Sequence, residues 1–260
     1  MAKTNFTLII LAGGDGTRMK PASLITPKPL LVSYDEPLLI RQVRQANEAG
    51  ISQILVSTNP KDYTTTKKAL RICKVKAEVL KNEHHREGSL PALSFAIEKT
   101  STPKILMSFA DIYFLNSPFF EFKNTGRHSL GISKAFDKRE LSLGGIVFAD
   151  ESVIQKIVEL PIKDNIRGYR WNGLALFDKI DSSDLKEFLE DNRLDSPEGD
   201  FFEYLRTKKK IDFLGIECPD FLNVNRPDNL LVVAMYRLSE VKKDKQLLTL
   251  ANRARIHILK

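Results

Sequence analysis

Short apolar runs alternate along the first half of the chain with longer stretches in which apolar residues recur every three or four positions. The runs have the length and composition of buried strands, and the stretches have helical spacing. The expected strands lie at 7–11, 53–57 and 104–109, and the expected helices lie at 36–49, 61–71 and 90–99. This β-α alternation predicts an α/β fold in which helices cover both faces of a largely parallel sheet.

The pattern changes after about residue 125. The runs GISKAF, GGIVFAD and IQKIVEL have strand character and shorter connections, which predicts a mixed sheet or a subdomain grown from the same core. Residues 222–240 predict a turn, a proline at a helix start, and a long amphipathic helix that packs back on the sheet. Because no linker separates the halves, we treat 1–260 as a single domain with halves at about 1–125 and 126–260.

The composition is that of an ordinary globular protein, with 42% apolar and 28% charged residues. No apolar run approaches the roughly 20 residues that cross a bilayer, and the first residues do not resemble a signal peptide. We therefore expect a cytoplasmic protein with no membrane partner. Cys73 and Cys218 form no CxxC pair, so the sequence supports neither a disulfide framework nor a zinc site.

The net charge of +7 suits a protein that handles polyanions. Much of the excess lies near the C-terminus, among leucines at helical spacing, in Arg237, Lys242, Lys243, Lys245, Arg253, Arg255 and Lys260. We expect these residues to form a solvated helix face. We do not expect a nucleic-acid partner, because no aromatic stacking platform accompanies the charges.

A glycine-rich turn follows the first strand and carries Gly13, Gly14 and Gly16. Glycine lets the backbone approach a ligand closely, so that successive amides can bind phosphate oxygens, and Arg18 adds a planar cation. A Rossmann GxGxxG motif would need glycine at Met19, and a P-loop would need Gly-Lys at Arg18-Met19. Neither motif fits. A purely structural turn leaves Arg18 and a downstream lysine unexplained, so we predict a triphosphate-binding loop.

Two further residues fit phosphate chemistry. Lys28 lies between Pro27 and Pro29, which stiffen the backbone from which its long cationic side chain extends. Asp111 follows the strand expected at 104–109, where a carboxylate can bind Mg²⁺ beside substrate phosphates or serve as a turn residue. We predict the magnesium role.

Residues 11–31, LAGGDGTRMKPASLITPKPLL, resemble the LAGGxGTRLxPLTxxxPKPLLP signature of the sugar-phosphate nucleotidylyltransferase family. Ala22-Ser23 departs from the Leu-Thr of that pattern. The resemblance implies a Rossmann-like nucleotide-diphospho-sugar transferase fold, three-layered α/β/α with a mostly parallel mixed central sheet. It also implies an NTP-binding first half, an acceptor-binding second half, and Arg18 and Lys28 as catalytic residues.

The same resemblance implies ligands for the nucleotide and the metal. The nucleotide would contact the glycine loop and a small-residue turn, at Leu11, Ala12, Gly13, Gly14, Gly16, Thr17, Gly88 and Ser89. Residues 223–230 are similar to a family segment of the form D-V-G/N-T-P-E-D-L, which makes Asn223 and Asn225 candidates to join Asp111 at Mg²⁺. Alternatively, both asparagines cap the helix that begins at Pro227. The adjacent His84 and His85 are assigned no catalytic role.

Acceptor contacts are implied by two later likenesses. Gly145 and Glu159 fall in segments similar to the family's Y-G-V-V and V-E-K-P, and Asn172 and Gly173 fall in one similar to G-I/L-Y. Leu160 replaces the family lysine, so one alternative is an acceptor other than a typical hexose 1-phosphate. Nearby Lys163 could substitute for that lysine, and Trp171 could either stack on a ring or belong to the core.

The sequence thus predicts transfer of a nucleoside monophosphate from an NTP to a sugar 1-phosphate, with Mg²⁺ and release of pyrophosphate. One alternative is a cytidylyltransferase acting on an amino-alcohol phosphate such as phosphocholine, whose ammonium group an aromatic or acidic pocket would bind. Another is a catalytically silent regulatory homologue. Homo-oligomers are compatible with the sequence.

Overall fold

The computed structural model describes residues 4–123, 125–142, 145–159, 168–178, 180, 182–192 and 194–258. Their strands are β1 (Thr4–Ala12), β2 (Ile51–Thr58), β3 (Glu78–Lys81), β4 (Lys104–Phe109), β5 (Ile112–Phe114), β6 (Ser129–Ser133), β7 (Ile146–Asp150), β8 (Val153–Val158), β9 (Tyr169–Asp178), β10 (Leu214–Glu217) and β11 (Phe221–Asn223). Their helices are α1 (Leu38–Glu48), α2 (Tyr63–Ile72), α3 (Ser89–Ile97), α4 (Ser182–Asp191), α5 (Glu198–Thr207), α6 (Pro227–Lys242) and α7 (Lys245–Ile258). Short 3-10 helices are η1 (Thr17–Met19), η2 (Ala22–Leu24), η3 (Lys28–Leu30) and η4 (Lys138–Ser142).

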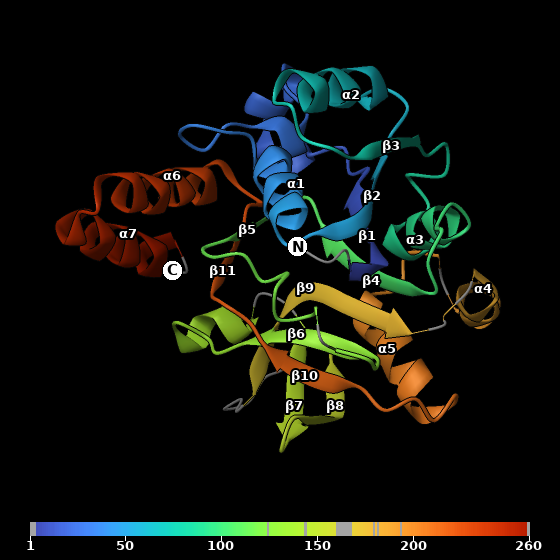
Figure 1. Ribbon diagram of the computed structural model, residues 1–260. Helices are drawn as coiled ribbons and strands as arrows, with labels where there is room; N and C mark the ends of the chain where they lie inside the picture. The colour runs from blue at the N-terminus through green and yellow to red at the C-terminus, as the bar shows by residue number, and fades with distance from the viewer. Residues whose placement is uncertain are drawn as a thin grey trace.

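Among the described residues, nine strands form one mixed sheet in the order β3-β2-β1-β4-β9-β6-β10-β8-β7 (Figure 1). Strands β3, β2, β1 and β4 are parallel neighbours. Strand β9 joins β4 to β6 with antiparallel pairing, and β6 pairs in parallel with β10. The predicted α/β fold is confirmed. The expectation of a largely parallel sheet is wrong, because only four of the nine strand pairings in this sheet, among the described residues, are parallel. Three of these four lie in the first half, where helices connect successive strands.

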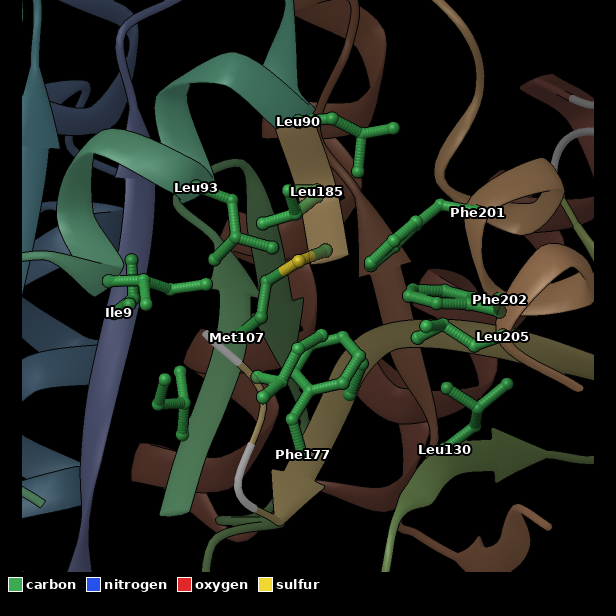
Figure 2. Close-up of a cluster of buried hydrophobic side chains, with 14 of the residues drawn as sticks. Ile9, Leu90, Leu93, Met107, Leu130, Phe177, Leu185, Phe201, Phe202 and Leu205 are labelled. Carbon is green, nitrogen blue, oxygen red and sulfur yellow. The ribbon is translucent and has the colours of Figure 1, made fainter. Parts of the chain in front are cut away.

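The two faces of the sheet bury separate cores, because side chains of a strand alternate between faces. In β1, Ile9 packs with α3, α4 and α5, whereas Leu8 and Ile10 pack on the opposite face with α1. Figure 2 shows the first core, in which Met107 of β4 and Phe177 of β9 lie among leucines of α3 and the aromatic rings of α5. Helices therefore cover both faces, as the alternating pattern predicts.

Helices α6 and α7 form a pair beside the small antiparallel sheet of β5 and β11 (Figure 1). The predicted helix begins at Pro227 and continues to Lys242. Its buried Val232 and Val233 share a core with Tyr113 of β5 and Leu222 of β11. The helix thus packs on the small sheet and on α7, whereas the sequence predicted packing on the central sheet.

The solvated basic face predicted at the C-terminus is wrong for Arg255. Its side chain is 1% exposed, and its guanidinium donates hydrogen bonds to Glu140 and Asp220. Glu140 also accepts a hydrogen bond from Arg170, at 2.7 Å. The partner carboxylates lie far from Arg255 in the sequence. A pattern of basic residues and leucines therefore could not predict that Arg255 is buried.

No helix in the described part of the chain is long and apolar enough to cross a membrane.

Candidate active site

The site begins where β1 and β4 end side by side. These strands pair in parallel, with Leu11 opposite Phe109, so their carboxyl ends open at the same edge of the sheet. A cavity of about 370 Å³ lies there. Its walls are formed by Leu11, Ala12, Gly13, Gly14, Asp15, Gly16, Thr17, Arg18, Met19, Lys28, Pro29, His85, Gly88, Ser89, Ala92, Phe109, Ala110, Asp111 and Asn225. Every residue predicted for the nucleotide and both predicted catalytic cations line this cavity.

The glycine loop has a fixed shape. Gly16 has φ 63°, a left-handed conformation that glycine adopts without strain, and its carbonyl accepts hydrogen bonds from Met19 N (2.9 Å) and Ser23 Oγ (2.7 Å). Met19 is fully buried and anchors the end of the loop. A side chain at Gly14 would meet nothing within 4 Å, so this position opens directly into the cavity.

Lys28 lies at the start of η3 and is held against two oxygens. Its ammonium Nζ donates to Asp111 Oδ2 at 2.6 Å and to Asn225 Oδ1 at 2.8 Å. The lysine side chain is 12% exposed, and that of Asp111 is 32% exposed. The structure therefore brings together a cation and two potential metal ligands that three separate segments of the chain supply.

The two oxygens around Lys28 fit a magnesium ion chemically. A carboxylate and an amide oxygen are hard ligands, and both already contact one cationic atom. No group of three or more His, Cys, Asp or Glu side chains suited to a metal gathers anywhere in the described residues. Mg²⁺ often takes one or two protein ligands and completes its coordination with water and substrate phosphates. Asp111 and Asn225 match that kind of site.

The candidate asparagines occupy different places. Asn223 pairs in β11 with Ile112 and does not line the cavity. Asn225 does line it, and its side-chain oxygen faces Lys28. The capping expected of these residues falls to Asn229, whose Oδ1 accepts from Arg226 N at 2.9 Å and from Asn225 N at 3.2 Å. The geometry therefore favours Asn225 over Asn223 as a partner of Asp111.

Gly88 and Ser89 lie at the start of α3 and form part of the cavity wall. Ser89 Oγ donates a hydrogen bond to Glu198, at the start of α5. Burial raises the pKa of Glu198, and the negative charge of Asp111 raises it further, while the Ser89 hydrogen bond opposes the shift. Glu198 is thus a carboxylate close enough to Asp111 for their charges to interact, and no sequence motif marks it.

His85 is a second residue of this region that has no predicted role. Its ring Nδ1 is buried and has no hydrogen-bond partner among the described residues, and its Cβ lies close to Gly13. The signal available in the sequence was its position, a few residues beyond β3 at the same edge of the sheet. His85 therefore forms part of the cavity wall beside the glycine loop.

Gly145 and Glu159, both predicted to contact the acceptor, lie next to each other but do not line the cavity, so their acceptor role stays a prediction. A Cβ atom at Gly145 would lie 3.1 Å from Glu159 Oε1, and the same oxygen accepts a hydrogen bond from Gly199 N at 3.0 Å. Burial, together with the charges of Glu198 and Asp200, raises the pKa of Glu159. Glu159, just after β8, and Glu198, at the start of α5, are thus neighbouring carboxylates, and Glu198 also feels the charge of Asp111.

Asn172 and Gly173 occupy the interior of β9 and do not line the cavity. Asn172 is 0% exposed, and its Oδ1 accepts from Leu174 N at 3.1 Å. Gly173 has φ 79°, and a Cβ there would lie 2.1 Å from Ile112, so this glycine permits close packing of β9 on β5. In this structure both residues serve packing, and acceptor contacts by them stay predictions.

Trp171 belongs largely to the core. Its indole lies edge-on to Phe109, with ring centroids 5.8 Å apart, and to Phe202, at 5.1 Å. Its Nε1 donates to Leu174 O at 2.9 Å. The second of the two predicted readings, a core tryptophan, fits these contacts. Leu160 and Lys163, on which the acceptor question depended, lie outside the described residues.

Comparison with known proteins bears on the first half most directly. Residues 8–122 match the family model of the MobA-like NTP transferase domain. Over 170 residues the chain is 31% identical to the mannose-1-phosphate guanylyltransferase catalytic subunit beta of Drosophila melanogaster, covering 59% of this chain and 43% of that protein. The chain spans between 14% and 45% of the length of the curated relatives that it matches.

Solved structures match nearly the whole chain. The inositol-1-phosphate CTP transferase from T. maritima has a TM-score of 0.71 at 16% identity, with 90% of this chain and 97% of that chain covered. The CTP:phosphocholine cytidylyltransferase from Streptococcus pneumoniae has a TM-score of 0.69 at 19% identity, with 91% and 99% covered. These likenesses confirm the nucleotide-diphospho-sugar transferase fold that the glycine-loop signature predicts.

Proposed function

We propose that this chain is a nucleotidyltransferase, and that it transfers a nucleoside monophosphate from an NTP to a sugar 1-phosphate and releases pyrophosphate. One observation carries the proposal: the glycine loop and the Lys28, Asp111 and Asn225 cluster line the same cavity. The guanylyltransferase relative, whose name specifies mannose 1-phosphate, supports a sugar 1-phosphate as acceptor.

The glycine loop would bind the triphosphate. Its open face at Gly14 leaves room for a phosphate against the backbone, where amide groups can donate to phosphate oxygens. Arg18 is exposed at the cavity wall and can hold two oxygens of the β- and γ-phosphates with its guanidinium. These contacts would stabilise negative charge on the pyrophosphate as it leaves.

Lys28 would neutralise charge at the α-phosphate. In the reaction, an oxygen of the acceptor phosphate forms a bond to the α-phosphorus, and the bond from that phosphorus to the β-bridging oxygen breaks. The acceptor phosphate is ionised at neutral pH, so the attack requires no protein base. Holding the two phosphates in line and offsetting their charge are then the main catalytic tasks. An ammonium on a short stiff segment between two prolines suits both tasks.

Asp111 and Asn225 would hold Mg²⁺. A bound Mg²⁺ would neutralise phosphate oxygens and strengthen the electrophilic character of the α-phosphorus. Since Lys28 contacts the same two oxygens, its ammonium would have to turn toward the α-phosphate when the metal is held there. The cluster thus supports a role for all three side chains at one reaction centre.

An amino-alcohol phosphate remains the second candidate acceptor. Glu159 and Glu198 lie close enough for the charge of Glu198 to raise the pKa of Glu159. A cationic head group placed between them would relieve that repulsion. The fold likeness to a phosphocholine cytidylyltransferase is compatible with this choice. The silent-homologue alternative is disfavoured, because Arg18, Lys28 and Asp111 all line the cavity.

Pyrophosphate release tests the proposal. Each of the four ribonucleoside triphosphates and dTTP is paired with a panel of sugar 1-phosphates and with phosphocholine, in the presence of Mg²⁺. We expect one base and one sugar 1-phosphate to give turnover that chelation of Mg²⁺ abolishes. Turnover with phosphocholine alone would establish the second candidate. Nucleotide binding without turnover for any pair would contradict the proposed activity.

A further inference from the structure

Gln42, on helix α1, lies outside the cavity wall and makes hydrogen bonds to the turn that carries Asp111. Its side-chain Nε2 donates to Phe109 O at 2.8 Å and to Ile112 O at 2.7 Å. These carbonyls flank the Ala110-Asp111 dipeptide, which connects β4 to β5. Gln42 does not line the cavity, so it can act on a substrate only through this turn.

The side-chain amide of Gln42 is fully used. Both of its N–H groups bind the two carbonyls, and its Oε1 accepts a hydrogen bond from Ser108 Oγ at 3.2 Å. Gln42 is 1% exposed, and Ser108 is 0% exposed. A buried amide with all its partners satisfied adopts one orientation, because any rotation would leave polar groups unpaired away from water.

Two further hydrogen bonds of the turn are made by backbone groups. Ala110 N donates to Leu11 O at 3.0 Å, which ties the turn to the strand preceding the glycine loop. Val224 N donates to Asp111 O at 2.8 Å, which ties it to the segment that supplies Asn225. Gln42 completes this set from the α1 side. The turn is therefore attached to β1, to the segment that supplies Asn225 and to α1.

The segment from Lys28 to Gln42 contacts the turn at both of its ends. Lys28, at its start, contacts the Asp111 carboxylate, and Gln42, fourteen residues later, contacts the backbone on both sides of that residue. Between them, Leu38 N donates to Leu31 O at 3.3 Å, which fixes η3 to the start of α1. One end of this segment thus contacts the Asp111 carboxylate, and the other end binds the backbone beside Asp111.

We propose that Gln42 is a positioning residue for nucleotidyl transfer, which sets the place of the Asp111 carboxylate relative to Lys28 and to a bound divalent cation. This inference rests on the proposed function. Residues that orient a metal ligand from behind are commonly worth about 10- to 100-fold in metal affinity or activity. Gln42 has the geometry of such a residue.

Replacement of Gln42 by methionine tests the inference. Gln42→Met keeps the length and volume of the side chain and removes both donors. We expect kcat to fall about 10- to 100-fold, with KM for the NTP changed less than threefold, and half-saturating Mg²⁺ to rise about tenfold. Calorimetric titration of the nucleotide-free protein with Mn²⁺ alone should show a matching loss of affinity.

Gln45→Met is the matched control. Gln45 lies one turn further along α1, is also buried at 8% exposure, and its Oε1 has no partner among the described residues. It makes no contact with the turn among the hydrogen bonds of the structure. We expect this variant to keep wild-type kcat, Mg²⁺ requirement and Mn²⁺ affinity. The comparison then distinguishes a general disturbance of α1 from loss of the Gln42 hydrogen bonds to residues 109–112.

The outcomes separate the two proposals. Wild-type protein without activity on any pair would remove the proposed function, whatever Gln42 does. An active wild type whose Gln42→Met variant is folded and keeps kcat, the Mg²⁺ requirement and Mn²⁺ affinity within twofold would overturn the role of Gln42. If Gln42→Met does not fold, Gln42→Glu decides in its place. It keeps the shape, and its carboxyl cannot donate to both carbonyls, so the same losses are expected and their absence overturns the proposal.

Discussion

The ammonium of Lys28 lies 2.6 Å from the carboxylate of Asp111, although 83 residues separate them in the chain. The same ammonium contacts the side-chain oxygen of Asn225 at 2.8 Å. Both oxygens are suited to Mg²⁺, so the Lys28 ammonium occupies the position that a bound metal ion would take. The contact therefore joins two requirements of nucleotidyl transfer, a cation for the α-phosphate and ligands for a metal.

Lys28 and a divalent metal should compete for these oxygens. Removing the ammonium in Lys28→Met should raise the affinity of the nucleotide-free protein for Mn²⁺ by about tenfold, or ~1.4 kcal/mol. Asp111→Asn should lower it instead. Lys20→Met is the control, because Lys20 is exposed and does not line the cavity. Calorimetry with Mn²⁺ measures all three, and equal affinities in wild type and Lys28→Met would disprove the competition.

The glycine loop gives a second prediction. Gly16→Ala places a side chain at φ 63° with its Cβ 3.0 Å from that of Lys28, so we expect a loss of about 1–2 kcal/mol in stability together with reduced turnover. Gly14→Ala meets no atom within 4 Å and should leave stability unchanged while raising KM for the NTP. Denaturant unfolding and steady-state kinetics check both. Equal effects of the two alanines would show that the loop conformation is unimportant.

Much of this site was accessible from sequence because its signals are local. The glycines, Arg18 and Lys28 lie within one short stretch, and Asp111 directly follows an apolar strand. The carboxyl ends of parallel strands share one edge of a sheet, so these residues were expected to meet. Periodicity placed α1, α2 and α3 to within a few residues for the same reason.

Residues whose role depends on tertiary contacts were not predictable in this way. Glu198 reaches Ser89 across 109 residues, and Gln42 reaches Phe109 across 67. Neither belongs to a motif. Asn172 was expected at an acceptor and lies fully buried, because Gly131 on the neighbouring strand leaves room for its side chain. Such packing depends on side chains from strands that sequence patterns do not pair.

Glu198 should make stability depend on pH. Burial raises its pKa above the ordinary value of 4.5. Between that ordinary value and the raised pKa, the native state binds more protons than the unfolded state, so the stability of the protein falls as pH rises through this range. Glu198→Gln keeps an acceptor for Ser89 and does not titrate. Its Tm should exceed that of wild type at pH 8, and the difference should shrink as pH approaches 4.5.

A matched variant gives the comparison for this pH effect. Glu190 is exposed on α4, and Glu190→Gln should show no such pH-dependent difference from wild type. Thermal melts of the three proteins from pH 4.5 to pH 8 provide the measurement. A Tm difference for Glu198→Gln that is constant over this range would contradict the raised pKa.

Arg255 should be important for stability. Burial opposes its charge, but hydrogen bonds with Asp220 and Glu140 outweigh this effect and raise its pKa. Arg255→Met would leave Glu140, which is 3% exposed, without one of its two arginine partners. We expect a loss of about 3–5 kcal/mol in the free energy of unfolding. Arg253→Met, at an exposed position of α7, should cost less than about 0.5 kcal/mol, and equal losses would contradict the buried network.

Transfer of an isotopic label tests the central claim most directly. The protein is incubated with Mg²⁺, a sugar 1-phosphate from the panel, and an NTP labelled with ³²P at the α-position or, in a parallel reaction, at the γ-position. We predict that the α-label enters a nucleotide sugar while the γ-label leaves in pyrophosphate. We also predict that Lys28→Met slows this transfer about 10²- to 10³-fold without loss of fold. Release of the γ-label as orthophosphate, or undiminished transfer in Lys28→Met, would contradict the account.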